Sequence, residues 1–161
     1  MDQLALSGTK FINGYAANPV CSPSHYALMT GLHPSRVDST DFFIHNNRKR
    51  RAGNFIPAPI KSYLALEEQT LAETFKENGY STAFLGKWHL GDEEKYWPES
   101  HGFNVNVGGY SAGSPRGYFS PHKNPRLSDG EEGEYLTERL TNQAINLLDG
   151  YAKEDKPFLM A

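Results

Sequence analysis

The stretch that most constrains the fold is a helix-forming segment that leads directly into a strand-forming one. Glu67 to Asn78 is rich in good helix formers, and Gly79 follows at the position where a left-handed cap ends a helix. Tyr80 to Leu85 has the composition of a short strand, and Lys87 and His89 come just beyond its carboxyl end. Because sites in open α/β sheets collect at the carboxyl ends of strands, this pattern predicts an α/β fold with Lys87 and His89 near its site.

The rest of the chain alternates in the same way between helix and strand patterns. The clearest element is a helix over Glu134 to Tyr151, whose apolar residues fall on one face. So few strands would leave the faces and edges of a parallel sheet uncovered, which indicates a piece of a larger domain. The other predicted segments, in chain order, are a helix end at 2–8, a strand at 9–16, a helix at 24–30 closed by Gly31, a surface loop at 33–62, a loop at 92–133 with a strand near 103–107, and a strand-like run at 156–161.

The charge balance, the apolar runs and the single cysteine argue against nucleic-acid binding, a membrane span and an internal disulfide. In 161 residues, 16 Lys and Arg nearly balance 19 Asp and Glu, so no global charge favours nucleic acid as a partner. No run approaches the roughly 20 apolar residues that would span a membrane, and the first ten residues lack the layout of a signal peptide. The single cysteine, Cys21, cannot form an internal disulfide, so it is either a small buried hydrophobe or a reactive site.

Two segments of the chain resemble the signatures of the sulfatase family. The first spans Asn18 to Gly31, where the family pattern reads Cys-x-Pro-Ser-Arg and then a helix that ends in Thr-Gly. The second, Gly79 to Gly91, follows the family pattern Gly-Tyr-x-Thr and Gly-Lys-Trp-His-Leu-Gly at every position. Within the first segment His25 stands where the family has arginine, and the matching residues are Cys21, Pro23, Ser24, Thr30 and Gly31.

The resemblance implies a fold, an activity and a location. The fold would be an alkaline-phosphatase-like α/β/α sandwich with a mostly parallel sheet, of which residues 1–161 form a partial catalytic domain truncated at both ends. The activity would be hydrolysis of sulfate monoesters, either aryl or carbohydrate sulfates, in an exported protein. The family's calcium-binding aspartates and a second catalytic histidine and lysine would then lie outside the segment. The segment alone is therefore expected to bind calcium poorly and to turn over little substrate.

The resemblance also assigns roles to individual residues. Cys21 would be oxidised by the formylglycine-generating enzyme to formylglycine (3-oxoalanine), whose hydrate is the nucleophile and a calcium ligand. Lys87 would contact both the sulfate and the hydrate, and His89 would help to deprotonate the hydrate. His25 would replace the family arginine beside the nucleophile as a catalytic residue, and Ser111 would contact the substrate. A position just ahead of a helix suits Cys21 because helix amino termini bind anions and lower thiol pKa.

Other interpretations remain open for several of these residues. Without arginine at the His25 position, Cys21 could remain unmodified, and the protein would then be an inactive sulfatase-like binding protein. A phosphatase or phosphodiesterase of the same superfamily is the third possibility. Ser111 lies in a glycine-rich stretch that explains it equally well, and the basic run Arg48 to Arg51 is either a contact for a sulfated glycan or a solvated loop. Four further histidines have no metal-ligand spacing and are predicted to lie on the surface or in loops: His33, His45, His101 and His122.

Overall fold

A computed structural model describes residues 1–43 and 59–161, and a three-stranded parallel sheet lies at its centre. Strand β1 (Ser81–Leu85) is in the middle, between β2 (Val105–Val107) and β3 (Phe158–Met160). Ala83 is the common register point, because it lies opposite Val105 on one side and Met160 on the other. The predicted α/β class with a parallel sheet is therefore confirmed.

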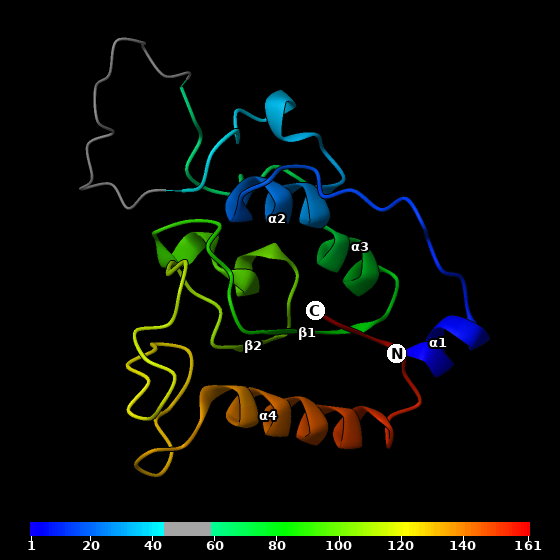
Figure 1. Ribbon diagram of the computed structural model, residues 1–161, viewed down its shortest axis with the longest axis vertical. Helices are drawn as coiled ribbons and strands as arrows, with labels where there is room; N and C mark the ends of the chain where they lie inside the picture. The colour runs from blue at the N-terminus through cyan, green and yellow to red at the C-terminus, as the bar shows by residue number, and fades with distance from the viewer. Residues whose placement is uncertain (44–58) are drawn as a thin grey trace.

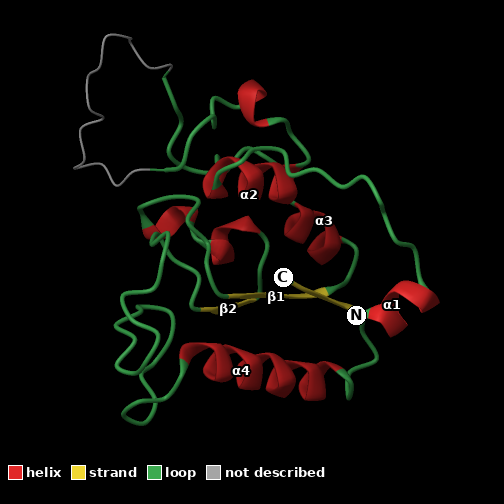
Figure 2. Cartoon of the chain, viewed as in Figure 1, coloured by secondary structure: helices red, strands yellow, loops and turns green. Residues whose placement is uncertain are grey.

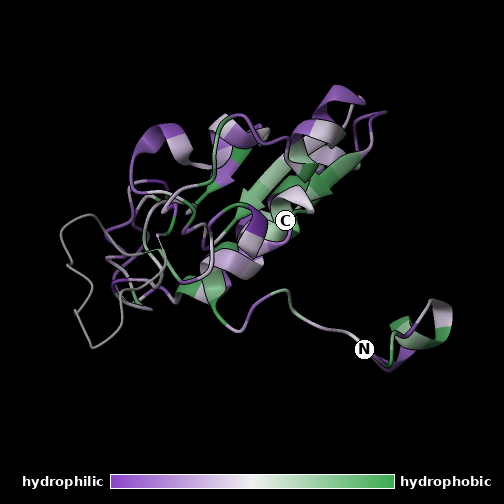
Figure 3. Ribbon diagram, turned by 90° about the horizontal axis from the view of Figure 1, so that it is seen from above, coloured by the Kyte–Doolittle hydropathy of each residue, from purple (hydrophilic) through white to green (hydrophobic). Residues whose placement is uncertain are grey.

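Helices cover both faces of the sheet. Figure 1 shows α2 (Cys21–Thr30) and α3 (Leu71–Glu77) above the strands and α4 (Leu136–Tyr151) below them, and Figure 2 separates the same three layers by colour. The short helix α1 (Asp2–Ser7) lies apart from these layers at the end of an extended arm, as the view in Figure 3 makes clear. No described helix is long and apolar enough to cross a membrane. The described residues also form three short 3-10 helices, namely η1 (Pro34–Arg36), η2 (Glu94–Tyr96) and η3 (Pro98–His101).

Local signals in the sequence account for the helix that precedes the central strand. The Thr70 side chain accepts from the Glu73 N–H at 3.2 Å, and the Glu73 carboxylate accepts from the Thr70 N–H at 2.8 Å. This capping box starts α3 at Leu71, four residues later than the helix predicted from Glu67. At the other end Gly79 has a φ of 86°, as the predicted left-handed cap requires, and the chain then enters β1.

The structure also corrects a predicted strand and the predicted start of α2. Residues 9–16 alternate apolar and polar side chains, but they form no strand and are exposed throughout. An alternating pattern becomes a strand only where a neighbouring strand supplies hydrogen bonds, and no described strand runs beside this arm. Cys21 was expected just ahead of a helix, whereas it is the first residue of α2.

The core between the sheet and the helices α2 and α3 is an aromatic cluster built around Trp88. The Trp88 ring is fully buried and packs edge-on against Phe84 and Phe103, with centroids 5.1 and 6.1 Å apart. Its indole N–H donates to the Tyr96 carbonyl at 2.7 Å, so the one polar atom of the ring is satisfied. Trp88 lies between Lys87 and His89 in the sequence, so this packing fixes the backbone of the predicted site.

Two of the histidines predicted to lie on the surface or in loops are buried, namely His101 and His122, although His122 does lie in a loop. His101 is the last residue of η3, and its ring lies 5.6 Å from that of Trp88 in the core. Spacing rules for metal ligands cannot predict this burial, because it follows from the packing of a loop against the aromatic cluster. Burial lowers the pKa of His101 from 6.5 to about 4, against smaller opposing effects of the Glu73 carboxylate and the Tyr96 backbone.

We expect the buried His101 to make the protein less stable in mild acid. The folded chain binds a proton at His101 less readily than the unfolded chain, so stability present above pH 6.5 is lost as the pH falls towards 4. The contribution of His101 is up to about 3 kcal/mol. Thermal unfolding measured from pH 7 to pH 4 tests this, and the His101→Leu variant should lose part of the slope. An unchanged slope in that variant would contradict the assignment.

Candidate active site

Cys21 is the first residue of α2, and side-chain hydrogen bonds stabilise the turn that precedes it. The Val20 N–H donates to Asn18 Oδ1 at 3.1 Å, and the Ser24 hydroxyl donates to the Asn18 carbonyl at 2.7 Å. The N–H groups of the first residues of α2 have no partner within the helix and lie at the positive end of its dipole. The Cys21 side chain is exposed, so it is accessible to a ligand at this end of the helix.

His89 reaches the same place from the carboxyl end of β1. Its backbone has a φ of 57°, in the left-handed region that few non-glycine residues adopt, and its N–H donates to the Tyr110 carbonyl at 3.0 Å. The ring Nε2 lies 3.0 Å from the Phe43 carbonyl oxygen, which can only accept, so Nε2 carries the hydrogen. In the neutral ring Nδ1 therefore holds a lone pair, and it lies 3.4 Å from Cys21 Sγ. His89 is placed to accept a proton from a group at position 21.

Ser22 is a residue of the site that the sequence analysis missed. Its hydroxyl oxygen lies 3.3 Å from His89 Nδ1 and accepts from the Phe43 N–H at 3.1 Å. Since His89 Nε2 bonds the Phe43 carbonyl, these contacts form a closed ring of hydrogen bonds through Phe43, Ser22 and His89. Ser22 occupies the unspecified position of the signature, and only its place beside Cys21 could have drawn attention to it.

We expect the Ser22→Ala variant to lose both stability and turnover. The buried Phe43 N–H would be left unpaired at a cost of about 1–3 kcal/mol, and His89 would lose one constraint on its ring. A drop in kcat of about tenfold is expected from the misplaced base. Thermal unfolding and the pH profile of kcat measure the two effects. Ser39→Ala is the matched control, because Ser39 is as buried as Ser22 and its hydroxyl has no partner among the described residues. Lower stability with an unchanged kcat and pH profile would show that Ser22 is only structural.

His25 lies one helical turn after Cys21 and packs towards the core. Its Nδ1 lies 2.8 Å from the Trp88 carbonyl and must donate to it, so Nε2 is an acceptor in the neutral ring. Burial lowers the pKa of His25, the nearby Lys87 and His89 lower it further, and the bond to Trp88 opposes them. A neutral acceptor therefore occupies the place where the family arginine would offer a charged donor.

The other two predicted residues lie close to this centre without a direct bond to Cys21 or His89 among the described contacts. Lys87 is exposed and borders a hollow of about 230 Å³ that Tyr110 also lines. Ser111 borders a different hollow, again together with Tyr110. Gly113 packs on His89, since a Cβ at position 113 would lie 2.7 Å from the His89 ring. The glycine-rich stretch thus contributes to the site because its backbone approaches the His89 ring closely. Its composition alone did not distinguish this role from that of an ordinary loop.

Comparison with known proteins decides the family. The family model described as Sulfatase matches residues 1–161. The chain belongs to the sulfatase family. It is 35% identical to human N-acetylgalactosamine-6-sulfatase over 162 residues, which is 99% of this chain and 29% of that protein. Human steryl-sulfatase is 37% identical over 114 residues, which is 67% of this chain and 18% of that protein. The chain thus spans less than a third of the length of these curated relatives.

Solved structures of sulfatase-like chains agree with the fold. The structure of Ps i-CgsB in complex with k-i-k-neocarrahexaose is 27% identical with a TM-score of 0.63, and the match covers 91% of this chain and 34% of that one. A protein solved in complex with its substrate D-glucosamine-2-N,6-O-disulfate is 25% identical with a TM-score of 0.57, over 92% of this chain and 25% of that one. The alkaline-phosphatase-like fold expected for a sulfatase is therefore confirmed.

The described residues of this sulfatase segment do not by themselves form a cation site. Among residues 1–43 and 59–161, no group of three or more His, Cys, Asp or Glu side chains gathers to hold a metal ion. Cys21, as formylglycine, is the one ligand that the family resemblance predicts here, and a calcium ion takes six to eight oxygen ligands. The described residues alone do not complete a calcium site, and no residue role assigned here depends on calcium. His45 and the basic run Arg48 to Arg51 lie outside the described residues.

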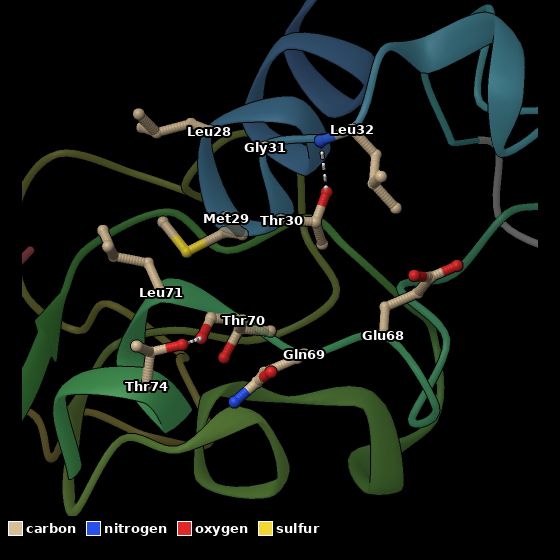
Figure 4. A pocket seen from close by; sticks show the side chains of 10 residues that line it. All are labelled: Leu28, Met29, Thr30, Gly31, Leu32, Glu68, Gln69, Thr70, Leu71 and Thr74. Carbon is tan, nitrogen blue, oxygen red and sulfur yellow. Dashed lines mark hydrogen bonds between the residues drawn. The ribbon is translucent and has the colours of Figure 1, made fainter. Parts of the chain in front are cut away.

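A separate hollow at the far end of α2 is not part of this site. It has a volume of about 540 Å³ and lies between the carboxyl end of α2 and the start of α3 (Figure 4). Two of its hydroxyl groups are engaged locally, because the Leu32 N–H donates to Thr30 Oγ1 and the Thr74 hydroxyl donates to the Thr70 carbonyl. None of the predicted catalytic residues lines it.

Proposed function

We propose that this protein hydrolyses sulfate monoesters, with Cys21 as the source of the nucleophile. The observation that supports this most directly is the 3.4 Å contact between Cys21 Sγ and His89 Nδ1 at the amino terminus of α2. Membership of the sulfatase family and relatives named as sulfatases support the same reaction. Because the chain covers under a third of those relatives, the activity is proposed for the whole protein.

Some groups of the site would transfer protons, and others would bind the sulfate anion. Formylglycine at position 21 would supply a hydrated aldehyde: one hydroxyl would attack sulfur and displace the alcohol, and loss of the proton of the other hydroxyl would then expel sulfate and restore the aldehyde. His89 Nδ1 is the base for that deprotonation, held in the required tautomer by the Phe43 carbonyl. The amino terminus of α2 and the exposed ammonium of Lys87 would stabilise the charge of the sulfate.

His25 and Ser111 have smaller proposed roles. His25 is a positioning residue, because its bond to the Trp88 carbonyl links α2 to the segment that holds His89. Ser111 follows Tyr110, whose carbonyl accepts the His89 N–H, and it would contact the leaving alcohol of the substrate. The relatives named for sulfated sugars support a carbohydrate sulfate as the natural substrate.

Two assays test the proposed function. Mass spectrometry of the peptide containing residue 21, after expression with a formylglycine-generating enzyme, should show the aldehyde in place of the thiol. Turnover of 4-nitrophenyl sulfate compared with 4-nitrophenyl phosphate should then favour the sulfate. Preference for the phosphate would identify a phosphatase of the same superfamily, and an unmodified thiol without turnover of either ester would support a binding protein.

Three further expectations from the family belong to this proposal. Calcium would be bound in part by formylglycine 21, maturation would require the formylglycine-generating enzyme, and the protein would be exported. Metal analysis of the purified protein tests the first. Dependence of the aldehyde on co-expression of that enzyme tests the second, and cell fractionation tests the third.

A further inference from the structure

A polar hollow beside the candidate site has the chemistry to bind a second sugar. Its volume is about 590 Å³, within the range of roughly 300–1,000 Å³ for small-molecule pockets. It adjoins the site through Tyr110, which also borders the hollow that Lys87 lines and whose carbonyl accepts the His89 N–H at 3.0 Å. The hollow lies among the side chains of Trp97, Tyr110, Arg116, Lys123, Asn124 and Asp129.

Most of the polar groups around this hollow are already engaged. The Asp129 carboxylate accepts from the backbone N–H groups of His122 and Lys123. The Asn124 side chain donates to the Gly108 carbonyl and accepts from the Arg126 N–H. Arg126, which lies between the lining residues Pro125 and Leu127 in the sequence, forms ion pairs with Glu94 and Glu99.

Two cations of the hollow differ from these engaged groups. Among the described ion pairs and hydrogen bonds, the side chains of Arg116 and Lys123 have no partner, and both residues are exposed. The aromatic rings of Trp97 and Tyr110 meet edge to face with centroids 6.2 Å apart at the same hollow. Trp97 is buried and Arg126 lies over its ring at 4.9 Å, so the half-buried Tyr110 is the ring that suits the C–H surface of a sugar, and the exposed cations suit an anionic substituent.

We propose that this hollow binds an anionic sugar that neighbours the sugar with the scissile sulfate. The inference rests on the proposed sulfatase activity, and it narrows the substrate to an oligosaccharide whose neighbouring sugar carries a carboxylate or a sulfate. Arg116 and Lys123 bind that anion, and Tyr110 contacts the ring. They are specificity residues, remote from the bond that is cleaved.

The test compares an Arg116→Gln, Lys123→Gln double variant with the wild-type protein. Binding is measured by calorimetry with two oligosaccharide pools: chondroitin 6-sulfate, whose neighbouring sugars carry carboxylates, and carrageenan, whose charges are all sulfates. At least one pool should bind about tenfold more weakly to the variant. Which pool responds identifies the anion. Lys153→Gln, an exposed lysine beyond the end of α4, is the control and should change neither.

Activity separates this inference from the proposed function. The double variant should hydrolyse 4-nitrophenyl sulfate at the wild-type rate, because that ester has no second sugar. Equal losses on 4-nitrophenyl sulfate and on the oligosaccharides would overturn the inference, as would unchanged or undetectable binding of both pools. If the wild-type protein binds a pool through these residues but hydrolyses no sulfate ester, the proposed activity fails and the sugar site stands.

Discussion

The Cys21→Ala variant is expected to lose at least about 10⁴-fold in kcat on 4-nitrophenyl sulfate, since removal of a covalent nucleophile removes the reaction path itself. The side chain is exposed and its one described contact is with His89, so the loss should come without a comparable loss of stability. Initial rates and thermal unfolding of the same preparations measure the two quantities.

The composition of these 161 residues simplifies this experiment. No second thiol in the 161 residues can substitute for Cys21, and alanine keeps the helical backbone of α2. A variant that retains more than a tenth of the wild-type rate would show that the nucleophile is another group. A variant that unfolds would instead assign Cys21 a packing role, in conflict with its exposure.

The His89→Asn variant should lower kcat by about 10²–10³-fold, within the usual contribution of a general base. Asparagine is chosen because it tolerates the left-handed backbone that His89 adopts, whereas a branched residue would strain it. Its amide reaches only to the position of the histidine Nδ1 and has no titratable nitrogen, so the group at position 21 loses its base and the Phe43 carbonyl loses its donor. The pH profile of kcat should therefore lose its acidic limb.

An exposed histidine supplies the control for His89. His33 caps η1 by accepting from the Ser35 N–H, a role that asparagine also fills, so His33→Asn should leave rate and stability unchanged. If the pH profile of kcat for His89→Asn kept its acidic limb, another residue would be the base. A raised KM with an unchanged kcat would mean that His89 binds substrate without transferring a proton.

Local features of this chain could be predicted, and long-range ones could not. Gly31 and Gly79 cap helices in the left-handed conformation because each follows a helical segment, a relation that lies within a few residues. The strand β1 with Lys87 and His89 beyond it follows from the same short range. The prediction of a strand at 9–16 was wrong because a strand depends on a neighbouring strand, which the local sequence does not contain.

The contacts of the site are of the long-range kind. Ser22 and His89 are 67 positions apart, and Phe43 closes their hydrogen-bond ring from a third segment. No spacing rule joins three such segments, so Ser22 was missed although its neighbour was identified. The burial of His101 and the bond from His25 to the Trp88 carbonyl were hidden for the same reason.

Substitutions at Trp88 would resemble catalytic defects in an activity assay. Its ring is fully buried, yet its neighbours in the chain are the exposed Lys87 and the proposed base His89, and its own carbonyl binds His25. A substitution such as Trp88→Phe would therefore register first as an enzymatic defect, although the changed side chain never meets substrate. Inherited or engineered variants at such positions would be misclassified as catalytic if activity alone were assayed, and only a paired measurement of folding would reveal their origin.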